Sequence, residues 1–508
     1  MQLTKGAIGN LINRYKAVLK KCHLMNTFGS LAVAGMLVMG GAGMAGAAIT
    51  TGQDFKNAVT NAKPGDTITL GQDIKEGSGA VFEEKTVTVD FGGHTYTGYS
   101  DSVGSTGTET QLFQLLKDSP AVTLKNGILN IATSPAESGK FKMVLQNYCD
   151  LTLDNMVVDG TNLLGDGTYT MSNNHGDITI NNSTIIAKKG GVAFDVYYTP
   201  SYDDGVSVTV NNSTINGKIE VTVANATALK DDAKKHKLTL TGGTLTGGLT
   251  AVQGAQLYNE GTTVISNVAM AGNTATDKGG AIFNSDDKTG AKGDLTLNNV
   301  DLKGNKANFG GAIWNAGTLT VEGGSFTDNS AAPADGSTVT VSTVGGAIYN
   351  ADDAKLSING TRFEGNTAAI AGAVNNQYDS SHITGITNAF FVNNTASLSA
   401  GGALRNQGSI DSIAGTTFEG NTAGNGGALW NGAGGTITSI TDTTFTGNKS
   451  TNAVVGGGAI TNADVITISA TTFTGNTAAG NGGAINNVVS GGGQANIALS
   501  NTTFTGNT

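Results

Sequence analysis

The sequence contains few residues of the kinds that stabilise small secreted domains. Its 508 residues include 2 cysteines and 5 prolines, and 13% of them are charged. The near absence of proline and the lack of a G-x-y period exclude a collagen-like chain. Cys22 lies in an N-terminal segment that we expect to be removed, so Cys149 would remain alone and an intramolecular disulfide is excluded. We therefore expect an apolar core to hold the fold together, with Cys149 as a small buried residue in it.

Glycine and apolar residues are abundant instead. The chain has 75 glycines, which is about twice the usual share of roughly 7%. Hydrophobic residues make up 38% of the chain, and β-branched residues alternate with polar ones. A chain of this composition can bury a core, which argues against intrinsic disorder.

The first 47 residues predict an extended signal peptide. Its five cations are Lys5, Arg14, Lys16, Lys20 and Lys21. An apolar run from Leu31 to Met39 follows, and Ala45-Gly46-Ala47 fits an A-x-A site with cleavage between Ala47 and Ala48. A transmembrane anchor is the alternative, but the apolar run is short and rich in glycine. Removing five cations from a chain of net charge −10 leaves −15, so the mature surface should repel nucleic acid.

Apolar residues recur with one spacing along the rest of the chain. The template is Φ-x-Φ-x4-Φ, where Φ is apolar, as in Leu356, Ile358 and Phe363. Residues two apart in a strand face the same way, and turn residues such as Asn, Gly and Thr fill the gap. The second apolar position falls at 89, 124, 153, 180, 210, 240, 265, 297, 321, 358, 386, 413, 440, 468 and 499. At Val89 the third member is missing, because His94 stands in its place, and at Ile413 and Ile440 the first member is missing.

This spacing predicts a solenoid. The fourteen steps average 29 residues and range from 24 to 37, without a helical pattern. One unit of strands and turns cannot bury its apolar face alone, so the units must stack. We therefore predict an all-β parallel β-helix with one coil per repeat, each coil adding roughly 4.8 Å.

A glycine motif, GGA[I/L]xN, follows the phenylalanine turn in most coils of the second half. Its intact copies begin at Gly279, Gly310, Gly345, Gly401, Gly426, Gly457 and Gly482, and a degraded copy spans Ala371 to Asn376. Glycine allows the positive φ of a tight corner, and the Ile or Leu side chain should point inward. The variable position should point outward; it is Phe283, Trp314, Tyr349, Arg405, Trp430, Thr461 or Asn486. We expect the closing Asn residues to form a ladder in which each amide donates to the next carbonyl. The Gly-Asn after each Phe predicts a second turn.

The two ends of the solenoid differ. Phe55, Ala58, Val59 and Ala62 have helical spacing, so residues 48–75 predict a cap with a short amphipathic helix. Residues 76–260 should form β-helix without the glycine motif, and residues 261–508 should form β-helix with it. The sequence stops at Thr508 within a repeat, which predicts that the solenoid is incomplete at this end.

The paired motifs GGA[I/L]xN and FxxN, as at Gly310 to Asn315 and Phe363 to Asn366, resemble the repeats of the chlamydial polymorphic outer membrane proteins. The resemblance covers about residues 270–508. It implies a right-handed β-helical passenger of an autotransporter, displayed on the cell surface and often acting as an adhesin. A C-terminal β-barrel in the outer membrane would carry this passenger out, but the sequence has no such pattern before it stops. The long basic signal also resembles the extended signals of type V secretion, and residues 49–250 look only generally like the β-helix of pectate-lyase-like proteins.

A polysaccharide lyase or glycoside hydrolase is the main alternative, because such enzymes also use β-helices. The best candidate groove contains Asp150, Asp154 and Asp159 near one coil, with Asp195, Asp203 and Asp204 one or two coils later. A glycosidase needs two carboxylates across a cleft, but Asp154 and Asp159 stand in Asp-Asn and Asp-Gly pairs typical of turns. After residue 47 the only arginines are Arg362 and Arg405, which argues against a lyase of acidic sugars. The histidines lack metal-ligand spacing, and we expect no catalytic residue, cofactor or metal.

These patterns together predict an exported, non-enzymatic protein of the outer membrane, cell surface or extracellular space. Its partner would be a host or bacterial surface protein or glycan. Trp314, Tyr349 and Trp430 are candidate contacts, because large exposed aromatic rings can stack on sugars or pack on proteins. Plain surface variation is the alternative for these three residues. A structural spacer is a third possibility for the chain.

Overall fold

The computed structural model describes residues 48–105, 107–199, 205–223, 236–247, 251–285, 293–337, 342–489 and 495–508. The predicted signal peptide, which ends at Ala47, lies outside these residues. Within the described part there is no helix that is both long and apolar enough to cross a membrane. Apart from one helix, α2 (Gly52–Asn61), its regular elements are strands that pair in parallel.

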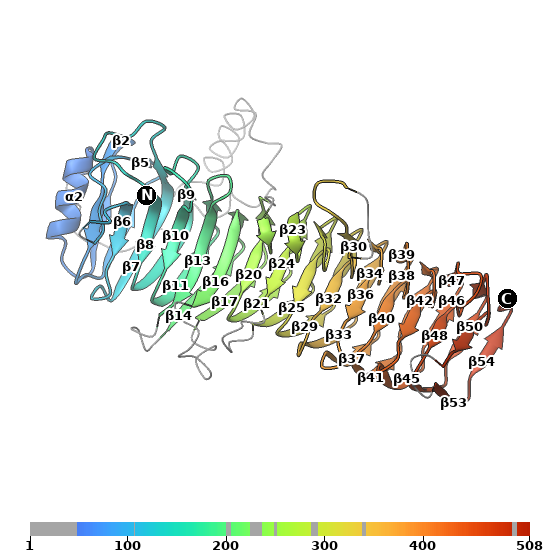
Figure 1. Cartoon of the computed structure of the whole chain (residues 1–508). Coiled ribbons are helices and arrows are strands. Elements are labelled where there is room, and N and C mark those ends of the chain that lie inside the picture. Colours follow the sequence, from blue (N-terminus) through green and yellow to red (C-terminus); the bar gives the residue numbers. More distant parts are fainter. Residues whose placement is uncertain are drawn as a thin grey trace, which may run out of the picture. The chain divides into compact units, whose positions relative to one another are not determined.

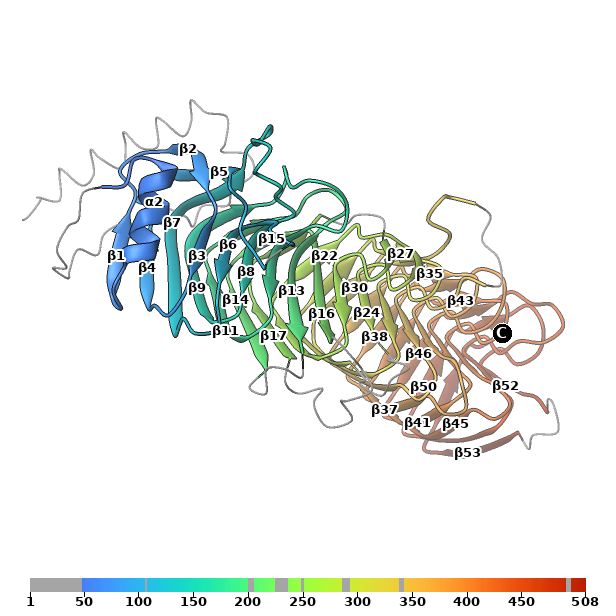
Figure 2. The same cartoon turned by 60° about the vertical axis from the view of Figure 1, so that its left-hand side comes forward.

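Strands of successive coils pair with one another in register. They form a 30-stranded sheet, a 15-stranded sheet and a short 7-stranded sheet. In one coil, β41 (Ser409–Ala414) and β42 (Thr417–Glu419) join the 30-stranded sheet, β43 (Thr422–Ala423) the 7-stranded sheet and β44 (Leu429–Asn431) the 15-stranded sheet. Figures 1 and 2 show such strands side by side, in the order of the sequence. The predicted all-β parallel β-helix is confirmed.

The 15-stranded sheet positions the candidate site. Its strands are β3 (Ala80–Phe82), β6 (Gln111–Leu115), β8 (Met143–Asn147), β10 (Tyr169–Asn173), β13 (Val192–Tyr198), β16 (Lys218–Val223), β20 (Leu257–Asn259), β24 (Ile282–Asn284), β28 (Ile313–Asn315), β32 (Ile348–Asn350), β36 (Val374–Asn376), β40 (Leu404–Asn406), β44, β48 (Ile460–Asn462) and β52 (Ile485–Asn487). From β20 onward each strand has three residues, of which the first and the last face the interior.

The periodic apolar residues meet in one core. The second template positions, from Val89 to Leu499, are Cα partners of one another in successive coils. All of them except Leu499 are at most 1% exposed. From Phe326 to Phe504 the third position is phenylalanine, and neighbouring rings stack with centroids 4.8–5.0 Å apart. In the first coil Tyr96, rather than His94, fills the third position by pairing with Leu129.

Three adjacent coils carry one extra residue in the strand that precedes the phenylalanine turn. In β37 (His382–Thr387), β41 and β45 (Thr436–Thr441) the two buried isoleucines are three positions apart instead of two, as in Ile410 and Ile413. Register shifts mark both edges of this group, between Leu356 and Ser357 and between Ile437 and Ile440. The extra residue forms a β-bulge, so the first apolar member is present in coils where the template had missed it.

The predicted N-terminal helix is confirmed. The Thr51 hydroxyl accepts a hydrogen bond from the backbone N–H of Asp54 at 3.1 Å, which caps the start of α2. Phe55 and Val59 are buried, and the Phe55 ring stacks on Phe113 with centroids 5.3 Å apart. The helix packs against β1 (Asp66–Thr69), β2 (Ile74–Ser78) and β3. It therefore covers the first strands with its apolar face.

The two glycines of the motif have different structural roles. In six of the seven intact copies, all except that at Gly457, the first has a positive φ, for example 60° at Gly426, which permits the corner before the next strand. The second lies against the neighbouring coil: a Cβ at Gly427 would lie 2.1 Å from the carbonyl oxygen of Gly458. A side chain at either position would therefore disturb the stacking of coils.

Candidate functional site

One residue from each strand of the 15-stranded sheet, from β6 onward, belongs to a single column that faces away from the core. Adjacent members are Cα partners, in the order Gln114, Gln146, Ser172, Asp195, Glu220, Tyr258, Phe283, Trp314, Tyr349, Asn375, Arg405, Trp430, Thr461 and Asn486. We call this set the outward column. Its members from Gln114 to Glu220 are polar, mostly amides and acids. Those from Tyr258 to Tyr349 are aromatic, and the rest, from Asn375 onward, include one arginine.

The prediction that Trp314 and Tyr349 are exposed is wrong. They face away from the main core as expected, but they are only 8% and 4% exposed. Their rings stack on one another with centroids 4.3 Å apart, and Phe309 packs edge-on against both. The ammonium of Lys278 lies 4.3 Å from the Trp314 ring centroid. These contacts form a second apolar cluster outside the main core, so the two rings stabilise the wall of the solenoid.

Trp430 and Arg405 are adjacent members of the outward column that remain partly accessible. Both are half-buried, and the guanidinium carbon lies 5.2 Å from the Trp430 ring centroid. The Nη1 group of Arg405 donates to Asn375 Oδ1 and to Gln377 Oε1, both at 2.9 Å, and Nη2 donates to Gln407 Oε1. Burial lowers the pKa of Arg405 to about 10, while Tyr349 acts in the opposite direction.

Arg362 has an ion-pair partner, and Arg405 differs from it in this respect. Arg362 pairs with Glu364, with Nε 2.7 Å from Oε2, and both side chains are exposed. Within the part of the chain that the structure describes, no carboxylate lies within ion-pair distance of Arg405. Sequence reasoning named Arg405 as one of several residues at a permissive position and as one of the two arginines after residue 47. It gave Arg405 no binding role, because neither its burial nor its amide partners can be read from the repeat.

The predicted acidic groove is not assembled. Asp154 and Asp159 lie in β9 (Asp150–Asp159) of the 30-stranded sheet, whereas Asp195 lies in β13 of the 15-stranded sheet. Asp159 accepts the backbone N–H of Thr161 at 2.8 Å, as expected of a turn residue. Asp203 and Asp204 lie outside the described residues. The described carboxylates of this set therefore belong to two different sheets.

Asp195 itself is buried in the outward column. Burial raises its pKa to about 7, although the backbone N–H of Asn173 and the hydroxyl of Ser172 donate to its carboxylate at 2.7 and 3.1 Å. Glu220 lies on the next coil and pairs with Lys218, with Oε1 2.9 Å from Nζ. Since Asp195 is only 6% exposed, a substrate would not reach its carboxylate in this structure.

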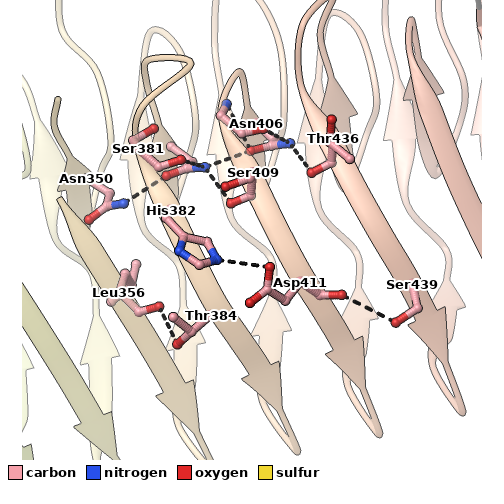
Figure 3. Close-up of polar contacts among 12 residues, drawn as sticks. Asn350, Leu356, Ser381, His382, Thr384, Asn406, Ser409, Asp411, Thr436 and Ser439 are labelled. Carbon is pink, nitrogen blue, oxygen red and sulfur yellow. Dashed lines mark hydrogen bonds and ion pairs between the residues drawn. The ribbon is translucent and has the colours of Figure 1, made fainter. Parts of the chain in front are cut away.

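Two ladders of buried asparagines run along the stack. The first contains the closing Asn residues of the glycine motif and starts one coil before the first motif, with each Nδ2 donating to the next Oδ1 at 2.7–2.8 Å from Asn259 to Asn487. Figure 3 shows Asn350 and Asn406 within it. This ladder confirms the prediction. The Asn residues after each phenylalanine turn form a second ladder at 2.8–3.0 Å, from Asn273 to Asn507, where the sequence had predicted only a turn.

His382 and Cys149, two further titratable residues, form a surface contact and a core contact respectively. His382 and Asp411 lie on adjacent bulged coils, with Nε2 2.9 Å from Oδ1, and both are partly exposed (Figure 3). Cys149 is buried, and burial raises the pKa of its thiol to about 12. Among the described residues, no three His, Cys, Asp or Glu side chains are grouped closely enough to hold a metal ion.

These features define a parallel β-helical repeat protein with a rigid column of outward side chains. Residues 267–285, 415–432 and 470–488 match the Chlamydia polymorphic membrane protein repeat, so the chain carries this repeat in at least three coils. The match agrees with the resemblance inferred from the motifs, and it implies an autotransporter-like surface protein with a β-helical passenger. The family also implies association with the outer membrane or the cell surface. No curated protein and no solved structure matches the chain.

Proposed function

We propose that the chain is an exported passenger that acts as an adhesin for a protein or glycan on a host or bacterial surface. The observation that carries the proposal is the accessible part of the outward column, where the Arg405 guanidinium and the Trp430 ring lie half-buried on adjacent coils at a fixed spacing. The asparagine ladders and the phenylalanine stack fix the backbone behind them. A rigid scaffold of this kind loses little entropy when it binds, because its groups are already ordered.

A binding experiment tests the adhesin role. The labelled 508-residue chain is added to cultured epithelial cells and to bacteria, and saturable binding is measured against an unrelated β-helical protein of similar charge. The proposal predicts saturable binding above this control. A structural spacer would bind neither surface, and that result would refute the adhesin role.

A second experiment separates the adhesin from a glycan-cleaving enzyme. The chain is incubated with a panel of plant and host glycans, and released reducing ends or unsaturated products are measured. We expect no product, because Asp154 and Asp159 lie in a different sheet from Asp195. Reproducible cleavage that is lost in the Asp154→Ala, Asp159→Ala or Asp195→Ala variant would favour the enzyme.

A further inference from the structure

Arg405 keeps two N–H groups available for a ligand. A guanidinium has five N–H donors, and three of those on Arg405 go to the side-chain oxygens of Asn375, Gln377 and Gln407. Within the described region, Nε–H and the second N–H on Nη2 have no acceptor. Two N–H donors on one planar guanidinium can bind two oxygens of a carboxylate or sulfate at once.

The neighbouring amides orient the guanidinium without neutralising it. Asn375 Nδ2 donates to Gln377 Oε1 at 2.9 Å, and Gln377 Nε2 donates to Gln407 Oε1 at 3.2 Å. This chain of amides and the Trp430 ring hold Arg405 in one position. A half-buried cation with neutral partners alone has lost hydration without gaining an ion pair. An anion from outside the chain would supply the missing electrostatic partner.

The groups around Arg405 suit a sugar better than a peptide. Tyr349 interacts electrostatically with Arg405 and is hydrogen-bonded to Tyr378, which places Tyr378 near the guanidinium. The Tyr378 ring is 45% exposed and offers a surface for stacking on a pyranose ring. The Gln407 amide nitrogen, which has no acceptor among the described residues, can donate to a sugar hydroxyl. Sugar sites commonly combine such aromatic surfaces with a few convergent polar groups.

We propose that Arg405, with Gln377, Gln407 and Tyr378, forms a subsite for the acidic group of a glycan. The carboxylate of a uronic or sialic acid, or the sulfate of a sulfated sugar, accepts the two available N–H groups of Arg405. This inference rests on the proposed adhesin function and deepens it by naming the ligand class. It requires binding only, so no bond of the sugar is broken.

The test measures the affinity of the full chain for four probes. Heparin oligosaccharides carry sulfate and carboxylate, hyaluronan oligosaccharides carry carboxylate alone, chito-oligosaccharides are neutral, and polyglutamate is an acidic peptide. We expect binding to heparin, to hyaluronan or to both, with the difference identifying the preferred acidic group. We expect no measurable binding to the neutral probe or to polyglutamate.

Two arginine variants provide a matched comparison. Arg405→Gln should weaken binding of the acidic glycan by about tenfold or more, because it removes the positive charge and the two available N–H donors of the guanidinium. Arg362→Gln should leave the affinity unchanged, because Glu364 already balances that arginine. Arg405→Lys keeps the charge but lacks the planar pair of N–H donors. Its affinity for the acidic glycan should therefore fall between those of the natural chain and of Arg405→Gln.

Unfolding measurements keep the comparison interpretable. Without ligand, Arg405→Gln should be at least as stable as the natural chain, because it removes a half-buried cation that lacks an ion-pair partner. If this variant does not fold, Arg405→Lys carries the test. Glycan affinity that is unchanged in the folded variants, or binding to polyglutamate alone, would overturn the subsite. Cell binding that persists without any glycan binding would overturn the subsite and leave the adhesin role standing. Glycan binding without cell binding would overturn the adhesin role and leave the subsite standing.

Discussion

Replacement of Asn406 by alanine tests how much the first asparagine ladder stabilises the stack. The Asn406 side chain is fully buried, and its Nδ2 donates to Asn431 Oδ1 at 2.8 Å and to the Gly408 carbonyl at 3.1 Å. Its Oδ1 accepts from Asn376 Nδ2 at 2.8 Å. The alanine variant therefore loses two links of the ladder and leaves the amide oxygen of Asn431 without its donor.

The expected cost follows from these contacts. A net hydrogen bond contributes about 1 kcal/mol, and a buried polar atom left without a partner costs about 1–3 kcal/mol. Asn376 keeps two weaker acceptors, the carbonyls of Ser381 and Ser409, both at 3.3 Å. We therefore expect a loss of about 3 kcal/mol, which is large for one substitution.

Hydrogen exchange measured by mass spectrometry is the suitable assay, because each coil of a solenoid contacts only its neighbours. A loss of about 3 kcal/mol should speed exchange roughly a hundredfold in β40 and β44 and much less in distant coils such as β11 (Gly176–Asn181). Asn359→Ala is the control, because that residue is exposed and its amide donates to Glu322 at 2.8 Å. If the two variants exchanged alike, the ladder would not stabilise the stack and the reasoning would be refuted.

Three further substitutions test the core, the close contact between coils and the buried acid. Phe418→Ala should lower the unfolding free energy by about 3–5 kcal/mol, whereas Phe390→Ala, at a residue 44% exposed, should cost less than about 1 kcal/mol in urea unfolding. Gly427→Ala should prevent normal stacking, seen as lost hydrogen-exchange protection, while Gly385→Ala, whose new Cβ would lie at least 3.5 Å from other atoms, should be tolerated. Burial raises the folded pKa of Asp195 to about 7, above an unfolded value of about 3.9. Its stabilising contribution is therefore present below about pH 4 and lost as the pH rises to about 7. Asp195→Asn should remove this loss of stability at higher pH. The loss is measured as the difference in urea midpoint between about pH 4.5 and pH 7.5.

The fold could be predicted because one signal, the spacing of apolar residues, fixes both the strands and their stacking. The spacing of Leu356, Ile358 and Phe363 predicts two short strands joined by a turn. In the structure all three side chains lie in the core. The closing Asn residues were predictable as a ladder because identical amides at one position of stacked coils lie within hydrogen-bond reach of one another.

The remaining features depend on contacts that the repeat does not encode. The template did not include Ile383, Ile410 and Ile437, because one inserted residue in each bulged strand moves the first apolar position. Trp314 and Tyr349 were expected to be exposed because their position points outward. Stacking between coils and the edge of Phe309 bury them.

Disulfide cross-linking of chosen outward positions tests the in-register stacking of coils most directly. Thr417 and Thr444 are Cα partners in β42 and β46 (Thr444–Thr446), and paired parallel strands lie at a spacing that a disulfide can bridge. With Cys22 and Cys149 replaced, the chain with cysteines at 417 and 444 should cross-link on mild oxidation. Cysteines at 417 and 472 should not, because Thr472 lies two coils away. Efficient linkage of the second pair, or failure of the first, would contradict the parallel β-helix.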